Sequence, residues 1–274
     1  MPPDLKNLDL QARTLRARII DNSSRTGTPH LGSCLSCSDI LVALYYHILR
    51  TDPAKPADPL RDRFILSKGH AAPALFQILA MRGFYPNEWL DHYGEDGSVF
   101  AEHPPTPSHL AGIEAATGSL GHGLPLAIGM ALSARILQRQ HHVYVLLGDG
   151  ECNEGSVWEA AMTAPALQLD QLTIIVDYNK WQATARSNEV LSLAPLADKW
   201  RAFGWDSCEI DGHDHSALVA ALTPPAQPSG KPRAIIANTI KGRGVSFMED
   251  DNNWHYRIPT GDEVRRAAEE LHNA

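Results

Sequence analysis

Two residues that follow neighbouring apolar runs are best suited to chemistry. Asp149 lies in a Gly-Asp-Gly turn after the run Val143–Leu147, and Asn179 follows the run Leu172–Val176. Two parallel strands joined by a crossover helix deliver both turns to the carboxyl edge of a sheet, so we expect the two side chains to be neighbours. A carboxylate and an amide oxygen suit a hard divalent cation such as Mg²⁺, with diphosphate oxygens and water completing its coordination.

The glycines on either side of Asp149 indicate that the anion is held close to the backbone. Gly148 and Gly150 carry no side chain, so their N–H groups can approach a phosphate. The helix expected after this turn would present its positive amino end to the same anion. The segment therefore predicts a site for a diphosphate and its metal ion.

The rest of the chain must build the sheet that holds these turns. Short apolar runs alternate with helical patterns, which predicts an α/β fold with a mostly parallel sheet and helices on both faces. The expected strands are Arg63–Leu66, Val143–Leu147, Leu172–Val176, Ser207–Ile210 and Arg233–Asn238. The expected helices are Leu5–Asn22, Asp39–Arg50, Ala71–Arg82, Leu124–Gln138, Ala194–Phe203 and His215–Leu222, with a charged helix at the end of the chain. Ser23–Ser38 is expected to be a polar connection, and Pro165 to kink or end the helix between the two central strands.

Length and composition favour one soluble globular domain. The chain has 274 residues, 43% of them hydrophobic and 20% charged, and we assign residues 1–274 to a single domain. A formal net charge of −8 and the lack of a basic run argue against nucleic-acid binding. We expect no membrane span and no signal peptide. Four cysteines without a dense framework suggest free thiols in a reducing compartment, the cytoplasm; the isolated pair Cys34 and Cys37 is not interpreted as a zinc or redox site.

Histidines occupy several of the polar segments. His70 ends Ser67-Lys68-Gly69-His70 at the turn after an expected strand, and Glu102-His103-Pro104 lies in the long irregular segment Phe84–Leu120. Loops of that length inside a compact domain are usually functional or disordered. We expect His213 and His215, by contrast, to cap or solvate a turn.

Several motifs together resemble a known family. The chain is similar to the N-terminal half of transketolase in seven motifs. In chain order these are SKGHA, TGSLGHG, GDGECNEGSVWEA, DYN, LADKWRAFGW, DGHD and IKGRGVSFMED…WH. The resemblance covers nearly the whole chain. It implies a thiamine diphosphate-binding fold and the transfer of a two-carbon ketol unit from a ketose to an aldehyde. The length resembles transketolases split into two polypeptides.

The resemblance also implies roles for individual residues. Metal binding (Mg²⁺ or Ca²⁺) falls to Asp149, Asn179 and the backbone carbonyl of Trp181. The residues implied to bind the cofactor are His70, Gly118, Ser119, Leu120, Gly148, Asp149, Gly150, Glu151, Asn179 and His255. The residues implied to be catalytic, near the diphosphate or along the sugar channel, are His30, His70, His103 and His255. Several neutral histidines are the expected means of moving protons on sugar hydroxyls near pH 7.

A partner chain is implied as well. In the family, a glutamate of the pyrimidine-binding domain activates the cofactor, and we find no segment here that supplies it. We therefore expect activity only with a C-terminal transketolase subunit that carries this domain, in a heterodimer or a dimer of heterodimers.

Some positions depart from the family pattern on the sugar side of the site. These are Pro29, Ser33, Glu102, His122 and Ala185. A carboxylate at Glu102 would disfavour a nearby anionic group, which suggests a modified ketose or an unusual acceptor. Two alternatives stay open: another thiamine diphosphate enzyme, such as a 2-oxo acid dehydrogenase or a deoxyxylulose phosphate synthase, and an inactive cofactor-binding homologue.

Overall fold

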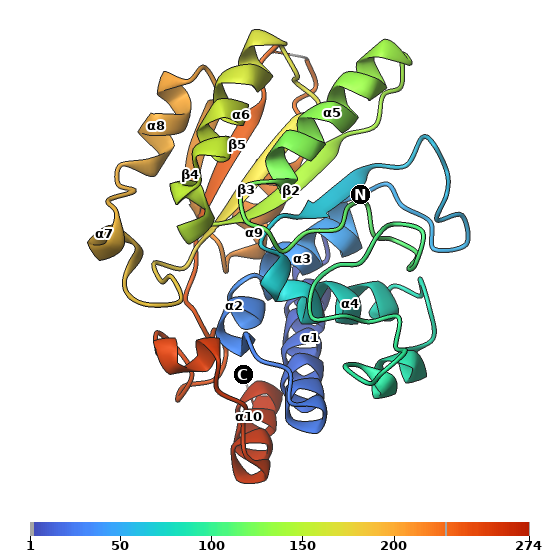
Figure 1. Ribbon diagram of the computed structural model, residues 1–274, viewed down its shortest axis with the longest axis vertical. Coiled ribbons are helices and arrows are strands. Elements are labelled where there is room, and N and C mark those ends of the chain that lie inside the picture. Colours follow the sequence, from blue (N-terminus) through green and yellow to red (C-terminus); the bar gives the residue numbers. More distant parts are fainter. Residues whose placement is uncertain (1–2, 228, 274) are drawn as a thin grey trace.

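The centre of the protein is a five-stranded parallel sheet (Figure 1). The computed structural model describes residues 3–227 and 229–273. The strands are β1 (Arg63–Leu66), β2 (Val143–Gly148), β3 (Leu172–Tyr178), β4 (Asp206–Asp211) and β5 (Arg233–Asn238). Their spatial order is β1-β2-β3-β5-β4, and every neighbouring pair is parallel. The expected strands are confirmed, with additional residues at the ends of β2, β3 and β4.

Helices cover both faces of this sheet, as the sequence predicted. They are α1 (Leu5–Thr26), α2 (Leu31–Ser36), α3 (Ser38–Ala43), α4 (Ala72–Met81), α5 (Gly123–Ile136), α6 (Gly155–Ala166), α7 (Ser187–Val190), α8 (Leu196–Ala202), α9 (His215–Leu222) and α10 (Gly261–Asn273). Helices α5, α6 and α8 lie over one face, whereas α1, α3, α4 and α9 lie over the other (Figure 1). Within the described residues no helix is long and apolar enough to cross a membrane.

Alternating side chains of the central strands supply two separate cores. Tyr144 and Leu146 of β2 pack with the helices of one face, and Val143, Val145 and Leu147 pack with those of the other. All six residues of β2 are buried, because a parallel sheet between two helical layers has no solvated face. This double burial explains why β2 and β3 are unbroken apolar runs in the sequence.

The expected connection Ser23–Ser38 is wrong in part. Helix α1 continues to Thr26, and Leu31–Ser36, a mixture of small residues and two leucines, forms α2, which is completely buried. A side chain at Gly32 would meet Cγ of Lys241 at 2.9 Å, so tertiary packing requires the small residue that suggested a loop.

Of two smaller expectations about helix ends, one is altered by the structure and one is confirmed. The expected helix Asp39–Arg50 instead begins at Ser38 and ends in a π-helical turn, Leu44–Ile48. Helix α6 ends at Ala166, one residue after Pro165, so the early end expected from this proline is confirmed.

His213 does not solvate a turn as expected. Its Nδ1 lies 2.6 Å from Oδ2 of Asp39, and its Nε2 accepts a hydrogen bond from the backbone N–H of Ile240 at 2.9 Å. Arg16 binds the same carboxylate, and these partners outweigh burial and hold the pKa of Asp39 below its usual range. His215 is likewise buried, and it is Asp214 that caps α9. His213 thus joins α3 to the segment that follows β5.

Candidate active site

A cavity of about 360 Å³ opens at the carboxyl edge of β1, β2 and β3. Ligands of open α/β sheets bind at this edge, and the volume is within the range of small-molecule sites. Most of the residues proposed from the sequence line it, namely His30, His70, Gly118, Leu120, Gly148, Asp149, Gly150, Glu151, Asn179, Trp181 and His255. The fold therefore gathers into one cavity residues that lie up to 225 positions apart in the chain.

Two of the proposed residues do not line this cavity. Ser119 is exposed. His103 is not a lining residue either, and its ring centroid lies 6.5 Å from that of His30, which does line the cavity. A Cβ on Gly118 would meet the His103 ring at 2.9 Å, and Gly118 has a φ of +144°, which side chains rarely adopt. The ring of His103 thus packs on the glycine turn that forms one side of the cavity.

The turns after β2 and β3 meet, as expected from the strand-helix-strand pattern. Asp149 is buried, and its Oδ2 accepts from the N–H of Lys180 and from Oγ of Ser187, both at 2.8 Å. Oδ1 of Asn179 accepts from the N–H of Trp181 at 3.1 Å. Burial raises the pKa of Asp149 to about 6, because the charged carboxylate has lost much of its hydration. The two oxygen-bearing side chains are neighbours on one wall.

The opposite wall is a cluster of imidazoles. The ring centroid of His30 lies 5.4 Å from that of His70 and 5.0 Å from that of His255. Burial, together with neighbouring cationic or imidazole groups, lowers the pKa of His30 to about 4 and that of His255 to about 3. Burial and the nearby Lys68 also lower the pKa of His70. All three rings are therefore neutral near pH 7, each able to donate and to accept a proton.

Lys241 is a site residue that the sequence reasoning missed. It is almost fully buried, and its Nζ lies 2.7 Å from Oδ1 of Asn252 and 3.1 Å from Nδ1 of His255. Burial, reinforced by Lys68, lowers the pKa of Lys241 to about 8. Its position in the Lys-Gly-Arg-Gly segment was the available signal, but nothing local indicates that this segment folds back beneath the histidines.

A second missed feature is the buried ion pair between Lys68 and Asp177. Nζ of Lys68 donates to Oδ2 of Asp177 and, at 3.0 Å, to the backbone carbonyl of Ser33. The same carboxylate accepts from Thr239 and, at 3.2 Å, from Nδ2 of Asn179. Burial disfavours both charges, yet each partner stabilises the other, so the pKa of Lys68 is raised and that of Asp177 is lowered. This network joins the turns after β1, β3 and β5 and directs the oxygen of Asn179 away from Asp177.

Glu151 lines the cavity, but its carboxylate is occupied within the protein. It accepts from Oγ of Ser67, from the N–H of Gly121 at 2.9 Å and from the N–H of Gly148 at 3.1 Å. This side chain therefore holds the glycine turns together at the mouth of the cavity.

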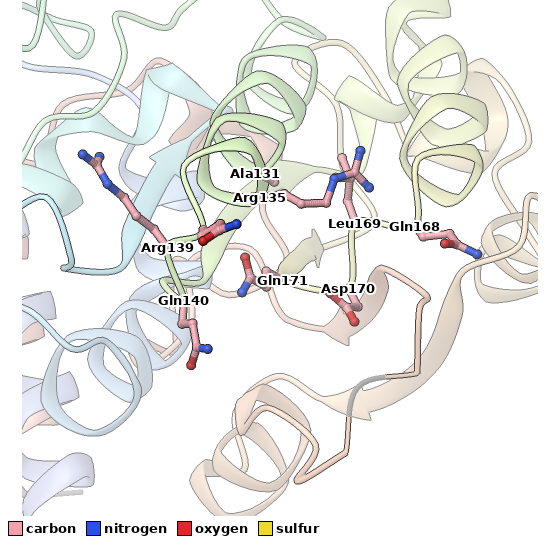
Figure 2. A pocket seen from close by; sticks show the side chains of 9 residues that line it. Ala131, Arg135, Arg139, Gln140, Gln168, Leu169, Asp170 and Gln171 are labelled. Atoms are coloured by element: carbon pink, nitrogen blue, oxygen red, sulfur yellow. The ribbon is translucent and has the colours of Figure 1, made fainter.

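A different cavity, of about 260 Å³, lies at the opposite edge of the sheet (Figure 2). Arg135 and Gln140 precede β2, and Gln168 and Asp170 precede β3, so it sits at the amino ends of these strands. None of the candidate catalytic or cofactor-binding residues lines it.

The geometry agrees with a family comparison over almost the entire chain. The family model described as transketolase, thiamine diphosphate binding domain, matches residues 9–272. The chain belongs to this family. The resemblance inferred from the motifs is thereby confirmed, and thiamine diphosphate is the cofactor of this domain family.

Two relatives of this transketolase-family chain have similar length. A protein from Phocaeicola vulgatus, named as one of the subunits of apulose-4-phosphate transketolase, is 39% identical over 267 residues, covering 97% of this chain and 94% of the relative. The 6-deoxy-6-sulfo-D-fructose transketolase subunit from Clostridium sp. is 40% identical over 265 residues, covering 97% of this chain and 96% of the relative.

A solved transketolase from Pichia stipitis, in complex with sedoheptulose-7-phosphate, has the same fold. It superposes with a TM-score of 0.89 at 27% identity, covering 97% of this chain and 41% of that one. The transketolase-family chain thus corresponds to about two-fifths of that longer protein. The expected thiamine diphosphate-binding fold is confirmed.

Proposed function

We propose that this chain is the N-terminal subunit of a two-polypeptide transketolase, which transfers a two-carbon ketol unit from a ketose to an aldehyde. The observation that carries the proposal is one cavity with an oxygen-bearing wall, Asp149 and Asn179, opposite the imidazoles of His30, His70 and His255. Relatives of nearly the same length are named transketolase subunits.

The residues present fit thiamine diphosphate and a divalent cation. Among the described residues no cationic side chain forms a hydrogen bond with the buried Asp149, and Asn179 turns an amide oxygen to the same wall. An all-oxygen set of this kind favours Mg²⁺, or alternatively Ca²⁺. A Cβ on Gly150 would meet Cγ of Gln182 at 2.9 Å, so the glycine lets this turn pack closely against Gln182, and its N–H can approach a diphosphate without an intervening side chain. The carbonyl of Trp181 would complete the protein ligands of the ion.

The remaining residues bind, orient and move protons. Lys241, His70 and His255 would neutralise or donate to the diphosphate, while Gly118 and Leu120 would lie beside the aminopyrimidine ring. His30 and His103 would bind sugar hydroxyls. When bound, the cofactor supplies the nucleophilic carbon that carries the two-carbon unit. Neutral imidazoles exchange protons with the hydroxyls of donor and acceptor as that unit leaves one sugar and joins the other.

The substrate is proposed to be a ketose, phosphorylated or modified. The two relatives are named for apulose-4-phosphate and for 6-deoxy-6-sulfo-D-fructose. The exposed carboxylate of Glu102 precedes His103 and would repel an anionic group placed near it. Turnover of xylulose 5-phosphate relative to non-phosphorylated ketoses should rise in Glu102→Gln and Glu102→Gly. If the ratio of these turnover rates is unchanged in both variants, Glu102 does not determine substrate specificity.

Activity is proposed to require a C-terminal subunit that carries the pyrimidine-binding domain, with the site formed between the two chains. A dimer of heterodimers in the cytoplasm is the assembly we propose. Support comes from the relatives named as subunits and from four free cysteines, three of them buried.

The decisive experiment is co-expression with the pyrimidine-domain polypeptide encoded nearest to this chain. Ketol transfer from a panel of ketoses to a panel of aldehydes should require both chains, thiamine diphosphate and Mg²⁺. Full transfer by the single chain would contradict the split enzyme. Pyruvate decarboxylation without ketol transfer would reassign the complex to another thiamine diphosphate enzyme, and inactivity of a folded, cofactor-loaded complex would favour a binding homologue.

A further inference from the structure

One amide donor in the cavity lacks a partner among the residues that the structure describes. Nε2 of Gln182 is buried from solvent and makes no hydrogen bond to them, although this residue lines the cavity. Buried polar groups are almost always satisfied, because an amide that has lost water without gaining a partner is unfavourable. A donor kept unsatisfied at this place indicates a ligand atom that accepts from it.

The side chain is held against the Gly-Asp-Gly turn. Cγ and Cδ of Gln182 lie 2.9 and 3.3 Å from the place a Cβ on Gly150 would occupy. Its own backbone is fixed on both sides, since its N–H donates to the carbonyl of Ala185 at 2.9 Å and its carbonyl accepts from Nζ of Lys241 at 3.4 Å. The amide is therefore positioned by the fold rather than free to turn into solvent.

We propose that Gln182 is a diphosphate-binding residue that donates from Nε2 to a phosphate oxygen of the cofactor. This inference rests on the proposed function, since it assigns a further residue to the same site. Gln182 packs against the turn of Gly150, and its backbone carbonyl accepts from the ammonium of Lys241, so the groups that would attract an anion are close to this residue. Of the two polar atoms of an amide, the NH₂ group is the one that binds an anion there.

A second orphaned amide atom in the cavity does not compete for this role. Oδ1 of Asn153 is also buried without a partner in the described part of the chain. It is an acceptor, and an acceptor oxygen does not bind a phosphate oxygen. Of the two unpartnered atoms, only Nε2 of Gln182 is a hydrogen-bond donor, so only Gln182 can bind a phosphate oxygen in this way.

The test compares Gln182→Met, which keeps the length of the side chain but removes the amide, with Gln140→Met. Gln140 is an exposed glutamine at the opposite edge of the sheet (Figure 2). Calorimetry on the full chain in complex with its partner subunit would measure the dissociation constants of Mg²⁺–pyrophosphate and Mg²⁺–thiamine diphosphate. A hydrogen bond to a charged group contributes enough that Gln182→Met should weaken both by about tenfold or more, whereas Gln140→Met should change neither.

Thermal melting without ligand separates a binding role from a structural one. Removing an unsatisfied donor should leave the melting temperature of Gln182→Met equal to or above that of the wild type. A lower melting temperature with unchanged affinity for both probes would overturn the inference. So would weaker binding of thiamine diphosphate with unchanged binding of pyrophosphate, since the contact would then lie at the other end of the cofactor.

Failure of the proposed function gives a different result. If the wild-type chain and its partner bind thiamine diphosphate and transfer ketol units while Gln182→Met behaves like the wild type, only the role of Gln182 is wrong. If the wild-type complex binds neither probe, the diphosphate site itself is wrong and the inference fails with it.

Discussion

Nζ of Lys241 lies 3.1 Å from Nδ1 of His255. An ammonium group has only donors, so Nδ1 must accept and the ring proton must sit on Nε2. The His255 ring also packs against His30, at 5.0 Å between centroids. Lys241 thus sets the tautomer of His255, and it adds a positive charge beside a cavity that the buried Lys68 also lines.

Replacing Lys241 should weaken diphosphate binding. Lys241→Met removes a buried charge and a donor, so the dissociation constant of Mg²⁺–pyrophosphate should rise by about tenfold or more. Lys180→Met is the matched control, because the side chain of Lys180 is exposed near the same edge of the sheet. Equal effects of the two substitutions in calorimetry would exclude a specific role for Lys241.

The same lysine should make binding depend on pH. The pKa of Lys241 is lowered to about 8 in the ligand-free chain, and an anion favours its charged form. Above pH 8 the ligand-free lysine loses its proton, so affinity should fall by up to about tenfold per pH unit. Affinity in Lys241→Met should vary less between pH 8 and about 9.5. A wild-type affinity that is constant over this range would contradict the assignment.

Removing the carboxylate of Asp149 should abolish the dependence of cofactor binding on metal. Asp149→Asn keeps the size of the side chain but removes the negative charge, so Mg²⁺-dependent binding of thiamine diphosphate should fall by about a hundredfold. Chelation should weaken binding in the wild type but hardly change the residual binding of the variant. Binding to the variant that still responds to Mg²⁺ would place the ion elsewhere.

Removing only one partner of the ion pair between Lys68 and Asp177 should strongly destabilise the folded chain. Lys68→Met leaves a buried carboxylate without its cation, and we expect a loss of about 3–5 kcal/mol in the free energy of unfolding. Arg265→Met is the control, since Arg265 and Glu269 form an exposed pair on α10, and it should lose less than about 1 kcal/mol. Urea denaturation measures both, and equal losses would show that burial does not matter here.

Acid should destabilise the chain through the imidazole cluster. The folded-state pKa of His30 is about 4, below its ordinary 6.5, so between these values the unfolded chain binds a proton that the folded chain does not. Stability should therefore fall as pH decreases from about 6.5 to 4, by up to about 1.4 kcal/mol per pH unit for this group.

His30→Asn is the variant that checks this pH dependence. Asparagine suits the left-handed backbone of this residue, whose φ is 73°. The slope of unfolding free energy against pH should decrease in the variant by about one proton. An unchanged slope in urea denaturation would assign the acid sensitivity to other groups.

The parts of the fold that sequence reasoning predicted are those encoded over short distances. β2, its glycine turn, α6 and β3 are consecutive, so the apolar runs alone predicted that Asp149 and Asn179 would be neighbours. Helix α2 was missed because Gly32, which suggested a loop, is required by packing against the distant Lys241. The pairing of His213 with Asp39 also joins segments far apart in sequence, and no local pattern encodes it.

The residues of the candidate site likewise fall into those that a local sequence pattern predicts and those that only the fold brings together. The proposed metal- and diphosphate-binding residues in the turn after β2 have a local signature, whereas Lys241 and Gln182 come together only when the segments after β3 and β5 meet. A lysine or glutamine in a polar loop is ordinarily a solvated residue. The burial of Lys241 and the unpartnered amide nitrogen of Gln182 are properties of the folded chain.

The buried network around Asp177 also bears on the kinetics of cofactor exchange. Because Lys68, Thr239 and Asn179 are already joined to this carboxylate, the cavity walls need little further ordering when a ligand enters. The conformational entropy lost on binding is then mostly that of the ligand itself. Association with the single chain should consequently be limited by diffusion to the open edge of the sheet, and the proposed second subunit, by covering that edge, should slow dissociation.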